Sequence, residues 1–332
     1  MIPNNKDLAI VGIGTYLPKQ HLVKDVIKKA GGDTSEYKGW EKTGIAGPDE
    51  HPGNMGYLAT QKALENAGLN PSDLKIVIAC AMTWDFPAGA WTIANYSMKM
   101  LKTPTDCIGF DMVQGCISIL TSLDLCRNWL ESVGGGYAAI ICSLRYNETV
   151  DRKTITGDGP RGWGDGAGTL IVGLDRKKSA LVYKGASYHN DSKFLGGFQR
   201  KYGGTRFPIA PPDAHFYERM PATEYTDKEA YAQYLLGYTS SVNDLQKKFD
   251  LKPDWLICNH VSPTMVKAIL EICKVPESQL CSRGNEIGHV SSADVVFDLE
   301  KLLSDETRYG NVFAIASCMF AWGAGLFHRK RI

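Results

Sequence analysis

"ALENAGLNPSDLKIVIACAMT", residues 63–83, joins a helical pattern, a turn with a proline and an apolar strand in one stretch. Far along the chain, "LQKKFDLKPDWLICNHVSP", residues 245–263, has the same order of helix, proline-containing turn and buried strand. Units of this kind build the layers of α/β proteins, in which helices cover a sheet. The two stretches therefore predict a layered α/β fold with an internal repeat.

A second pair of segments supports the repeat. Residues 116–143 and residues 291–318 each contain a helix, a turn with glycine and a strand, and each follows its partner from the first pair. We predict two pseudo-equivalent halves in one body, residues 1–175 carrying the first two units and residues 176–332 carrying the others. Helix–turn–strand units are common in α/β chains, so a chance match is the alternative.

The composition is ordinary for a soluble globular protein. The 332 residues have a formal net charge of +1, 44% hydrophobic and 22% charged residues, and nine cysteines scattered among apolar strings. Near-zero charge and the lack of a basic run with aromatics argue against nucleic-acid binding. The chain has neither a secretory signal nor an apolar window of about 18 residues, the length that a membrane span needs. Unpaired, scattered cysteines are typical of reduced thiols, and we expect a cytoplasmic protein that binds no membrane.

Metal and dinucleotide cofactors are not expected. No Cys-x-x-Cys pair and no His/Cys cluster has the spacing of zinc ligands. The pair Gly12 and Gly14 lacks the third glycine of a dinucleotide-binding loop, and Pro18 follows it.

Cys116 is the strongest candidate for a reactive residue. It follows Gly115 and begins an apolar helical pattern. Free N–H groups and the helix dipole at such a position stabilise a thiolate and lower the pKa of the thiol, which makes the cysteine a nucleophile. A buried structural thiol is the alternative, and we expect it for the other eight cysteines.

Two histidines of the second half stand at the ends of predicted elements, as Cys116 does in the first half. His260 follows a predicted strand, where ligands collect in open α/β sheets. His289 lies in "GHVSSADVV", the segment of the second half that corresponds to the surroundings of Cys116. Pseudo-symmetry should bring these strand and helix ends together in the middle of the molecule. We therefore expect both imidazoles beside the sulfur of Cys116.

Four motifs carry a resemblance to a known family. They are "VQGCISIL", "GWGDGAGTLIVG", "WLICNHVSPTMVKAI" and "IGHVSSADVVFDLEKLL". Together they resemble the β-ketoacyl-ACP synthase III family of the thiolase-like superfamily. The resemblance implies a five-layered α-β-α-β-α thiolase fold of two related halves. It also implies substrates that are thioesters of CoA or phosphopantetheine on acyl carrier protein, no cofactor, and a homodimer or a heterodimer with a related chain.

The resemblance also implies roles for single residues. Cys116 falls on the nucleophile that takes up an acyl group, and His260 falls on the catalytic histidine. His289 stands where most members have asparagine, so the catalytic set is Cys-His-His. Backbone N–H groups of Cys116 and Cys318 would form the oxyanion hole. Substrate-binding positions implied by the resemblance are Trp40, Lys42, Thr43, Arg161 and Asn259.

Departures from the family pattern leave the reaction open. His289 can donate the hydrogen bond that asparagine would donate, which keeps decarboxylative Claisen condensation possible. It can also act as a general base on an alcohol, amine or carbon acid, as in simple acyl transfer. Lys42 replaces a usual arginine, and the changes together favour an enzyme of secondary-metabolite or specialised fatty-acid biosynthesis. A non-catalytic partner subunit of a heterodimeric complex is the alternative. The acyl pocket is expected in residues 83–91 and 191–212.

Overall fold

The computed structural model describes residues 6–86, 90–153, 159–175, 179–196, 201–212 and 225–331. The strands are β1 (Leu8–Tyr16), β2 (Lys19–Leu22), β3 (Lys42–Ile45), β4 (Leu74–Cys80), β5 (Ile108–Met112), β6 (Tyr137–Leu144), β7 (Gly166–Leu174), β8 (Leu181–Asn190), β9 (Trp255–Cys258), β10 (Gly310–Cys318) and β11 (Ala321–Arg329). The α-helices are α1 (Val23–Lys29), α2 (Pro52–Ala67), α3 (Ile93–Leu101), α4 (Ser118–Ser132), α5 (Asp227–Phe249), α6 (Pro263–Cys273), α7 (Gly284–Ile287) and α8 (Ala293–Leu303).

Strand order reveals the internal repeat. The described residues form a nine-stranded sheet in the order β5-β4-β6-β7-β1-β8-β11-β10-β9. The run β4-β6-β7-β1 matches the run β9-β10-β11-β8, including the parallel first pair and the antiparallel pairs that follow. Strand β5 pairs with β4 in parallel, and a single parallel bridge between Leu256 and Leu280 stands in its place beside β9. The predicted pseudo-symmetry is therefore present. The runs β5-β4-β6-β7-β1 and β8-β11-β10-β9, which join through β1 and β8, are called the two sheets below.

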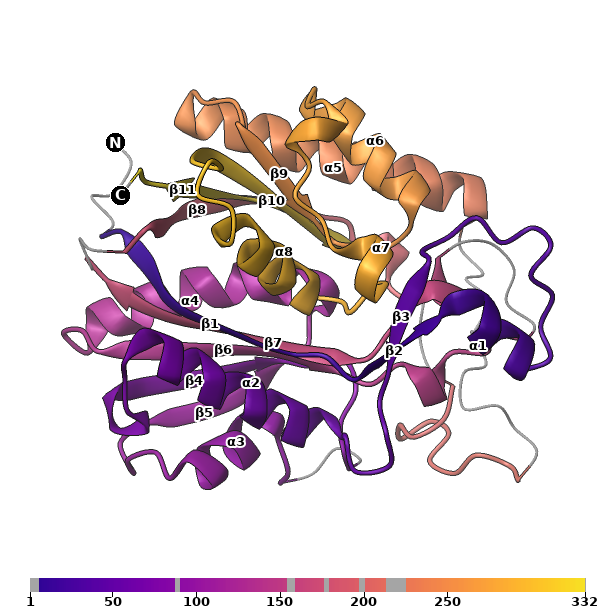
Figure 1. The fold of residues 1–332 in the computed structure, drawn as a ribbon, viewed down its shortest axis with the longest axis horizontal. Coiled ribbons are helices and arrows are strands. Elements are labelled where there is room, and N and C mark those ends of the chain that lie inside the picture. Colours follow the sequence, from indigo (N-terminus) through magenta and orange to yellow (C-terminus); the bar gives the residue numbers. More distant parts are fainter. Residues whose placement is uncertain are drawn as a thin grey trace.

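Helices and sheets alternate in five layers (Figure 1). Helices α2 and α3 cover the strands of the first half, and α5 and α6 cover those of the second. Helices α4 and α8 lie between the two sheets, and each contacts strands from both halves. This α-β-α-β-α arrangement confirms the predicted fold class. The predicted boundary between residues 175 and 176 falls between β7 and β8, next to residues 176–178 outside the described part, and stays a prediction.

Local sequence accounts for the repeated units. Helix α2 ends at Gly68, whose φ of 64° is the left-handed conformation that glycine adopts at a helix end. A short turn with Pro71 at its start then leads into β4. In the second half, Ser262 begins α6 by accepting a hydrogen bond from Met265 N, and Pro263 occupies the first helical position.

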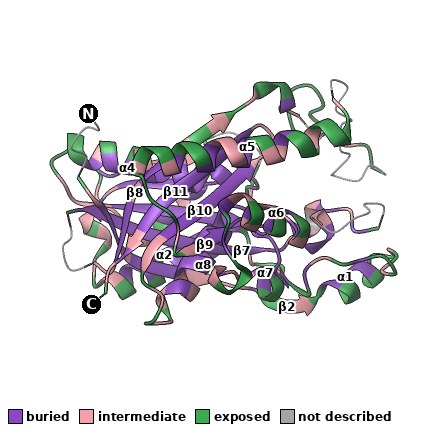
Figure 2. Ribbon diagram, turned by 90° about the horizontal axis from the view of Figure 1, so that it is seen from above, coloured by how far each residue is buried: buried purple, intermediate pink, exposed green. Residues whose placement is uncertain are grey.

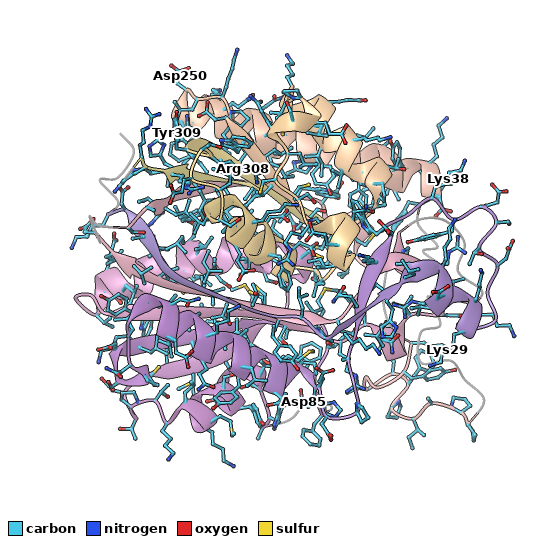
Figure 3. All side chains as sticks on the ribbon, in the orientation of Figure 1. Lys29, Lys38, Asp85, Asp250, Arg308 and Tyr309 are labelled. Carbon is cyan, nitrogen blue, oxygen red and sulfur yellow. The ribbon has the colours of Figure 1, made fainter. Side chains whose placement is uncertain are left out.

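The core lies between the sheets. Figure 2 shows central strands that are mostly buried and outer helices that are buried only on their inner faces, whereas the edge strand β5 has no buried residue. Helix α8, which lies between the two sheets, differs from the outer helices, because its first seven residues are all buried. Charged side chains such as Lys29, Lys38 and Asp250 lie at the periphery (Figure 3). Among the described residues, no helix has both the length and the apolar character needed to cross a membrane.

Candidate active site

Cys116 lies in a short 3₁₀ turn between β5 and α4. Gly115, which precedes it, has a φ of 63°, and a Cβ there would stand 2.5 Å from Cys318 Cβ. Only glycine fits that conformation and that contact. The turn thus presents the sulfur to the second half and presses against the end of β10, where Cys318 lies. Cys116 itself is 7% exposed.

His289 meets the sulfur from the other half. Its Nε2 lies 3.5 Å from Cys116 Sγ, and its Nδ1 lies 2.5 Å from Asp294 Oδ2. Because a carboxylate accepts, Nδ1 carries the proton, and the lone pair of Nε2 faces the thiol. Ser291 donates its hydroxyl to the same sulfur at 3.0 Å. Sulfur, imidazole and carboxylate therefore form a chain with the geometry of a nucleophile, its base and the group that orients the base.

The "GWGDGAG" turn holds His289 in place. The backbone of His289 donates to Gly162 O at 3.3 Å and accepts from Gly164 N at 2.9 Å. The ring of Trp163 meets the imidazole edge-on at 5.3 Å between centroids, and Tyr146 stacks on it at 6.5 Å. The position of His289 is thus set by a segment of the first half.

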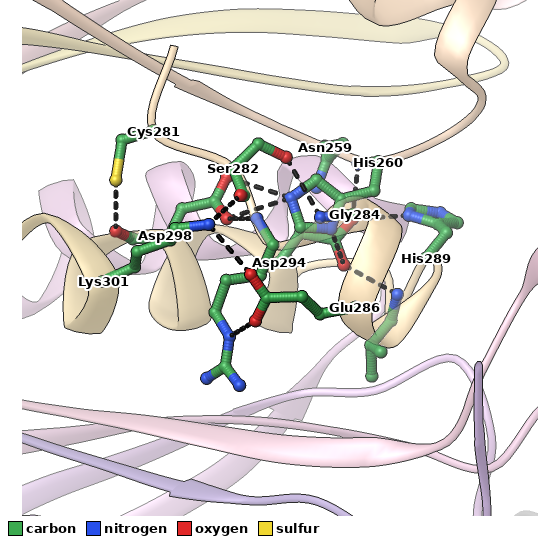
Figure 4. A network of polar contacts seen from close by, with 12 residues as sticks. Asn259, His260, Cys281, Ser282, Gly284, Glu286, His289, Asp294, Asp298 and Lys301 are labelled. Atoms are coloured by element: carbon green, nitrogen blue, oxygen red, sulfur yellow. Dashed lines mark hydrogen bonds and ion pairs between the residues drawn. The ribbon is translucent and has the colours of Figure 1, made fainter. Parts of the chain in front are cut away.

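His260 has a different surrounding (Figure 4). Its Nδ1 donates to Gly288 O at 3.1 Å, and its Nε2 lies 3.0 Å from both carboxylate oxygens of Asp298. Its backbone N donates to Asp294 Oδ2 at 2.7 Å. Among the described residues, the ring makes no hydrogen bond to Cys116. Of the two histidines expected beside the sulfur, His289 therefore lies within hydrogen-bond reach of it, while the ring nitrogens of His260 bind Gly288 and Asp298; the catalytic roles expected for both stay predictions.

Burial decides the protonation of the sulfur. It raises the pKa of the Cys116 thiol well above its ordinary value, although the hydroxyl of Ser291 acts in the opposite direction. The predicted lowering of this pKa by the helix start is wrong, because desolvation of a thiolate in this interior outweighs the hydrogen bonds. The thiol is neutral at rest and needs a base to ionise it, and His289 Nε2 is in reach.

The buried acids and His260 balance one another. Burial alone would lower the pKa of His260, but the charges of Asp294 and Asp298 raise it to about 9. Burial alone would raise the pKa of Asp294, but His260 and His289 lower it below its usual range. For Asp298 the effect of burial prevails, and its pKa is raised.

Most of the predicted substrate-binding residues form hydrogen bonds to the backbone of the protein. Thr43 Oγ1 donates to Trp163 O at 3.0 Å, and Arg161 donates to Asp33 O at 2.7 Å. Of the five predicted substrate-binding residues, Lys42 is exposed and the other four are buried.

Trp40 and Asn259 support neighbouring backbone. Trp40 Nε1 donates to His260 O at 2.7 Å. Asn259 donates to Ser291 O at 2.8 Å and accepts from Ser317 N at 3.0 Å, one residue before Cys318. The substrate-binding and oxyanion-hole assignments stay predictions. Of the predicted pocket segments, residues 87–89 and 197–200 lie outside the described residues.

Sequence reasoning missed Ser291, Asp294 and Asp298 as members of the site. The two aspartates stand four residues apart among the apolar residues that open α8, so they lie on one buried face of this helix. Charged residues on such a face are paired or functional, which is the signal that could have revealed them. Within the described part of the chain, no group of three or more His, Cys, Asp or Glu side chains could hold a metal ion.

The chain was compared with family models, with curated proteins and with solved structures. No family model matches the chain. Curated β-ketoacyl-[acyl-carrier-protein] synthase III from Chlamydia pneumoniae is 23% identical over 338 residues, which cover 98% of this chain and 96% of the relative. The same protein from Pectobacterium atrosepticum is 23% identical, with 96% and 98% coverage.

Solved structures agree with this fold. 3-Oxoacyl-(acyl carrier protein) synthase III (FabH) from Pseudomonas aeruginosa has a TM-score of 0.80 at 16% identity and covers 98% of this chain and 99% of its own. A variant of OleA from Xanthomonas campestris has a TM-score of 0.80 at 15% identity, with 98% of each chain covered. ChlB3, titled an acyltransferase, has a TM-score of 0.79 at 16% identity and covers 97% of this chain and 98% of its own. The chain therefore resembles β-ketoacyl-ACP synthase III along nearly its whole length, and its fold is the thiolase fold.

Proposed function

We propose that this chain is an acyltransferase that forms an acyl thioester on Cys116 and passes the acyl group to a second substrate. The observation that carries the proposal is the chain of contacts from Cys116 Sγ through His289 to Asp294. Full-length similarity to β-ketoacyl-ACP synthase III supports the transferase class and donors that are thioesters of CoA or acyl carrier protein.

In the first step, His289 Nε2 takes the proton of the Cys116 thiol as the sulfur attacks the carbonyl carbon of the donor thioester. The raised pKa of the thiol makes this transfer concerted with attack, since a free thiolate is disfavoured in the buried site. Asp294 stabilises the imidazolium that results. The backbone N–H groups of Cys116 and Cys318 would hold the oxyanion. When the carbon–sulfur bond of the donor breaks, the leaving thiolate receives the proton from His289.

In the second step, His289 acts as a base on the acceptor. An asparagine at this position would donate a hydrogen bond but could not accept a proton. Here Asp294 keeps the proton on Nδ1, so Nε2 meets the acyl-enzyme with a lone pair. This favours non-decarboxylative transfer to an oxygen or nitrogen nucleophile over Claisen condensation, which needs a donor toward the enolate. Such chemistry fits the proposed place in secondary-metabolite or specialised fatty-acid biosynthesis.

Intact-protein mass spectrometry tests the first step. The protein is incubated with a panel of acyl-CoA and acyl-N-acetylcysteamine thioesters, and one acyl adduct is expected. The adduct should be absent in Cys116→Ala. In Asp294→Asn its formation should slow by about 10⁴-fold, as expected when the base loses its orienting carboxylate. An unmodified protein across the whole panel would favour the alternative of a non-catalytic partner subunit.

Carbon dioxide release separates the two reactions of the second step. The acyl-enzyme is mixed with malonyl-CoA or with small alcohols and amines. We expect ester or amide products and no carbon dioxide. Stoichiometric carbon dioxide with a β-ketoacyl product would instead establish condensation.

A further inference from the structure

His260 has no ring nitrogen left for a substrate. Gly288 O can only accept, so it receives the proton on Nδ1 at 3.1 Å. Nε2 faces both oxygens of Asp298 at 3.0 Å, and Asp298 Oδ1 also accepts from Arg283 N at 2.8 Å. The ring and both aspartates of α8 are fully buried. In this arrangement His260 offers neither a lone pair to a proton nor a free N–H to a carbonyl oxygen.

The groups that His260 binds stand on both sides of His289. Gly288 directly precedes His289 and has a φ of 73°. Asp294, which orients His289, receives the backbone N–H of His260 at 2.7 Å, and His260 Nδ1 lies 3.4 Å from the other oxygen of this carboxylate. His260 thus fixes both Gly288, which precedes His289, and the carboxylate of Asp294, which orients it.

Charge gives His260 a second effect on Asp294. Two buried carboxylates in neighbouring turns of α8 repel each other, and without a cation one of them would take up a proton. A protonated Asp294 could donate to His289 Nδ1, which would move the lone pair to the wrong nitrogen. The raised pKa of His260, about 9, agrees with an imidazolium between the two acids. The other titratable group near both aspartates is the Cys258 thiol on β9, which burial keeps neutral.

We propose that His260 is a positioning residue: it holds Gly288 and Asp294 so that His289 keeps its lone pair on the Cys116 sulfur. The proposal rests on the proposed function, and it assigns His260 a role other than the catalytic one that the resemblance implied. Because His260 acts through His289, its removal should matter only while His289 is present.

A double-mutant cycle on Cys116 alkylation tests the proposal without any acyl donor. Iodoacetamide forms a carbon–sulfur bond and loses iodide, while His289 takes the thiol proton. Rates at Cys116 are followed by peptide mapping from pH 6 to 10. We expect His260→Gln to slow alkylation at pH 7 by at least about tenfold, the cost of losing charged hydrogen bonds. In the His289→Gln background the same change should alter the rate by less than about twofold, since the coupled partner is absent.

A matched pair at Asp298 keeps His260 itself intact. In Asp298→Asn the amide donates to Nε2 of a neutral imidazole, so the net charge of the cluster and the bond to Gly288 remain. We expect Asp298→Asn to slow alkylation of Cys116 at pH 7 clearly less than Asp298→Ala does, because a hydrogen-bond partner for Nε2 is kept. Asp298→Ala removes that partner, and alkylation of Cys116 should then need a higher pH than in wild type, as for a buried thiol without an oriented base. Thermal unfolding of each variant is measured alongside.

Equal slowing by His260→Gln in both backgrounds would overturn the proposal, and so would equal damage from Asp298→Asn and Asp298→Ala. The proposed function fails separately. A non-additive cycle without any acyl adduct from the thioester panel refutes acyl transfer and leaves the positioning role standing. An acyl adduct together with an additive cycle supports acyl transfer and refutes the positioning role of His260.

Discussion

At the scale of single residues, Ser291 combines an unfavourable backbone conformation with a contact to Cys116, the proposed nucleophile. Its φ is 52°, its hydroxyl donates to Cys116 Sγ at 3.0 Å, and its carbonyl is held by Asn259 at 2.8 Å. A buried non-glycine residue in the left-handed region costs about 1 kcal/mol or more. Such strain is retained at sites where the surrounding contacts require it.

Replacing Ser291 separates the two effects. Ser291→Ala and Ser291→Gly both remove the hydroxyl, and both should slow alkylation of Cys116 at pH 7 by about tenfold, the value of a hydrogen bond to a charged group. Glycine also relieves the backbone strain, so Ser291→Gly should melt at a higher temperature than Ser291→Ala. Unchanged alkylation in either variant, or a higher melting temperature for Ser291→Ala, contradicts this account.

The raised pKa of His260 also leads us to expect that the free energy of unfolding depends on pH. Its pKa rises from 6.5 to about 9 on folding, so its contribution is complete below pH 6.5 and is lost as the pH rises through 9. Urea unfolding between pH 6.5 and 9 should show this loss of free energy in wild type. The loss should be smaller in Asp298→Asn, where one of the two charges that raise the pKa is gone. Cysteines titrate in both proteins and cancel in the comparison; an equal loss in both rules out His260 as the cause.

At the scale of elements, α5 packs on β11 through a glycine. A Cβ on Gly237 would lie 2.1 Å from Cδ2 of Trp322, which is fully buried. Glycine inside a helix costs about 1 kcal/mol relative to alanine, so propensity alone favours a side chain here. The close approach of helix and sheet opposes that gain, because the ring of Trp322 has no space to move into.

Gly237→Ala should therefore destabilise the protein despite its better helix propensity. We expect a net loss of about 1–3 kcal/mol, the usual cost of overpacking a core. Leu236→Ala is the matched control, since Leu236 is 53% exposed on the same helix and should change stability by less than about 0.5 kcal/mol. Denaturant unfolding measures both, and a stabilised Gly237→Ala would show that this contact yields easily.

At the scale of the whole molecule, the two halves differ at the sheet edge. Strand β5 ends the nine-stranded sheet of the described residues and has no counterpart strand in the second half. Ile108 and Phe110 on this strand are 38% exposed, and Val113 just after it is 65% exposed. An open edge with apolar side chains is a surface that proteins normally cover.

We expect a homodimer in which β5 lies at the interface. Light scattering after size exclusion should give twice the mass of the chain. Phe110→Asp should give a monomer, because a carboxylate in an apolar contact is left without a partner. Leu236→Asp, on the outer helix α5, should leave the dimer intact. A wild-type monomer, or a dimer that persists in Phe110→Asp, excludes this interface.

The sequence by itself determined the repeated units and the place of Cys116 at the start of a helix. The helix, turn and strand of residues 63–83 follow from apolar periodicity and from Pro71 and Gly68, which act on their immediate neighbours. The place of Cys116 after a glycine in a sharp turn is likewise a local property. For these reasons the layered fold and the facing of Cys116 and His289 were predictable.

Only the tertiary structure decided which histidine ring contacts the sulfur and in which direction the pKa of the thiol shifts. The ring of His260 turns to Asp298, a residue far along the chain that reaches it only because β9 and α8 pack together. Asp294 differs, because it reaches His289 from only five residues further along the chain, at the start of α8. Burial, which raises the pKa of Cys116, is a sum over both halves of the molecule. Side-chain direction and desolvation depend on distant contacts, and no local pattern encodes them.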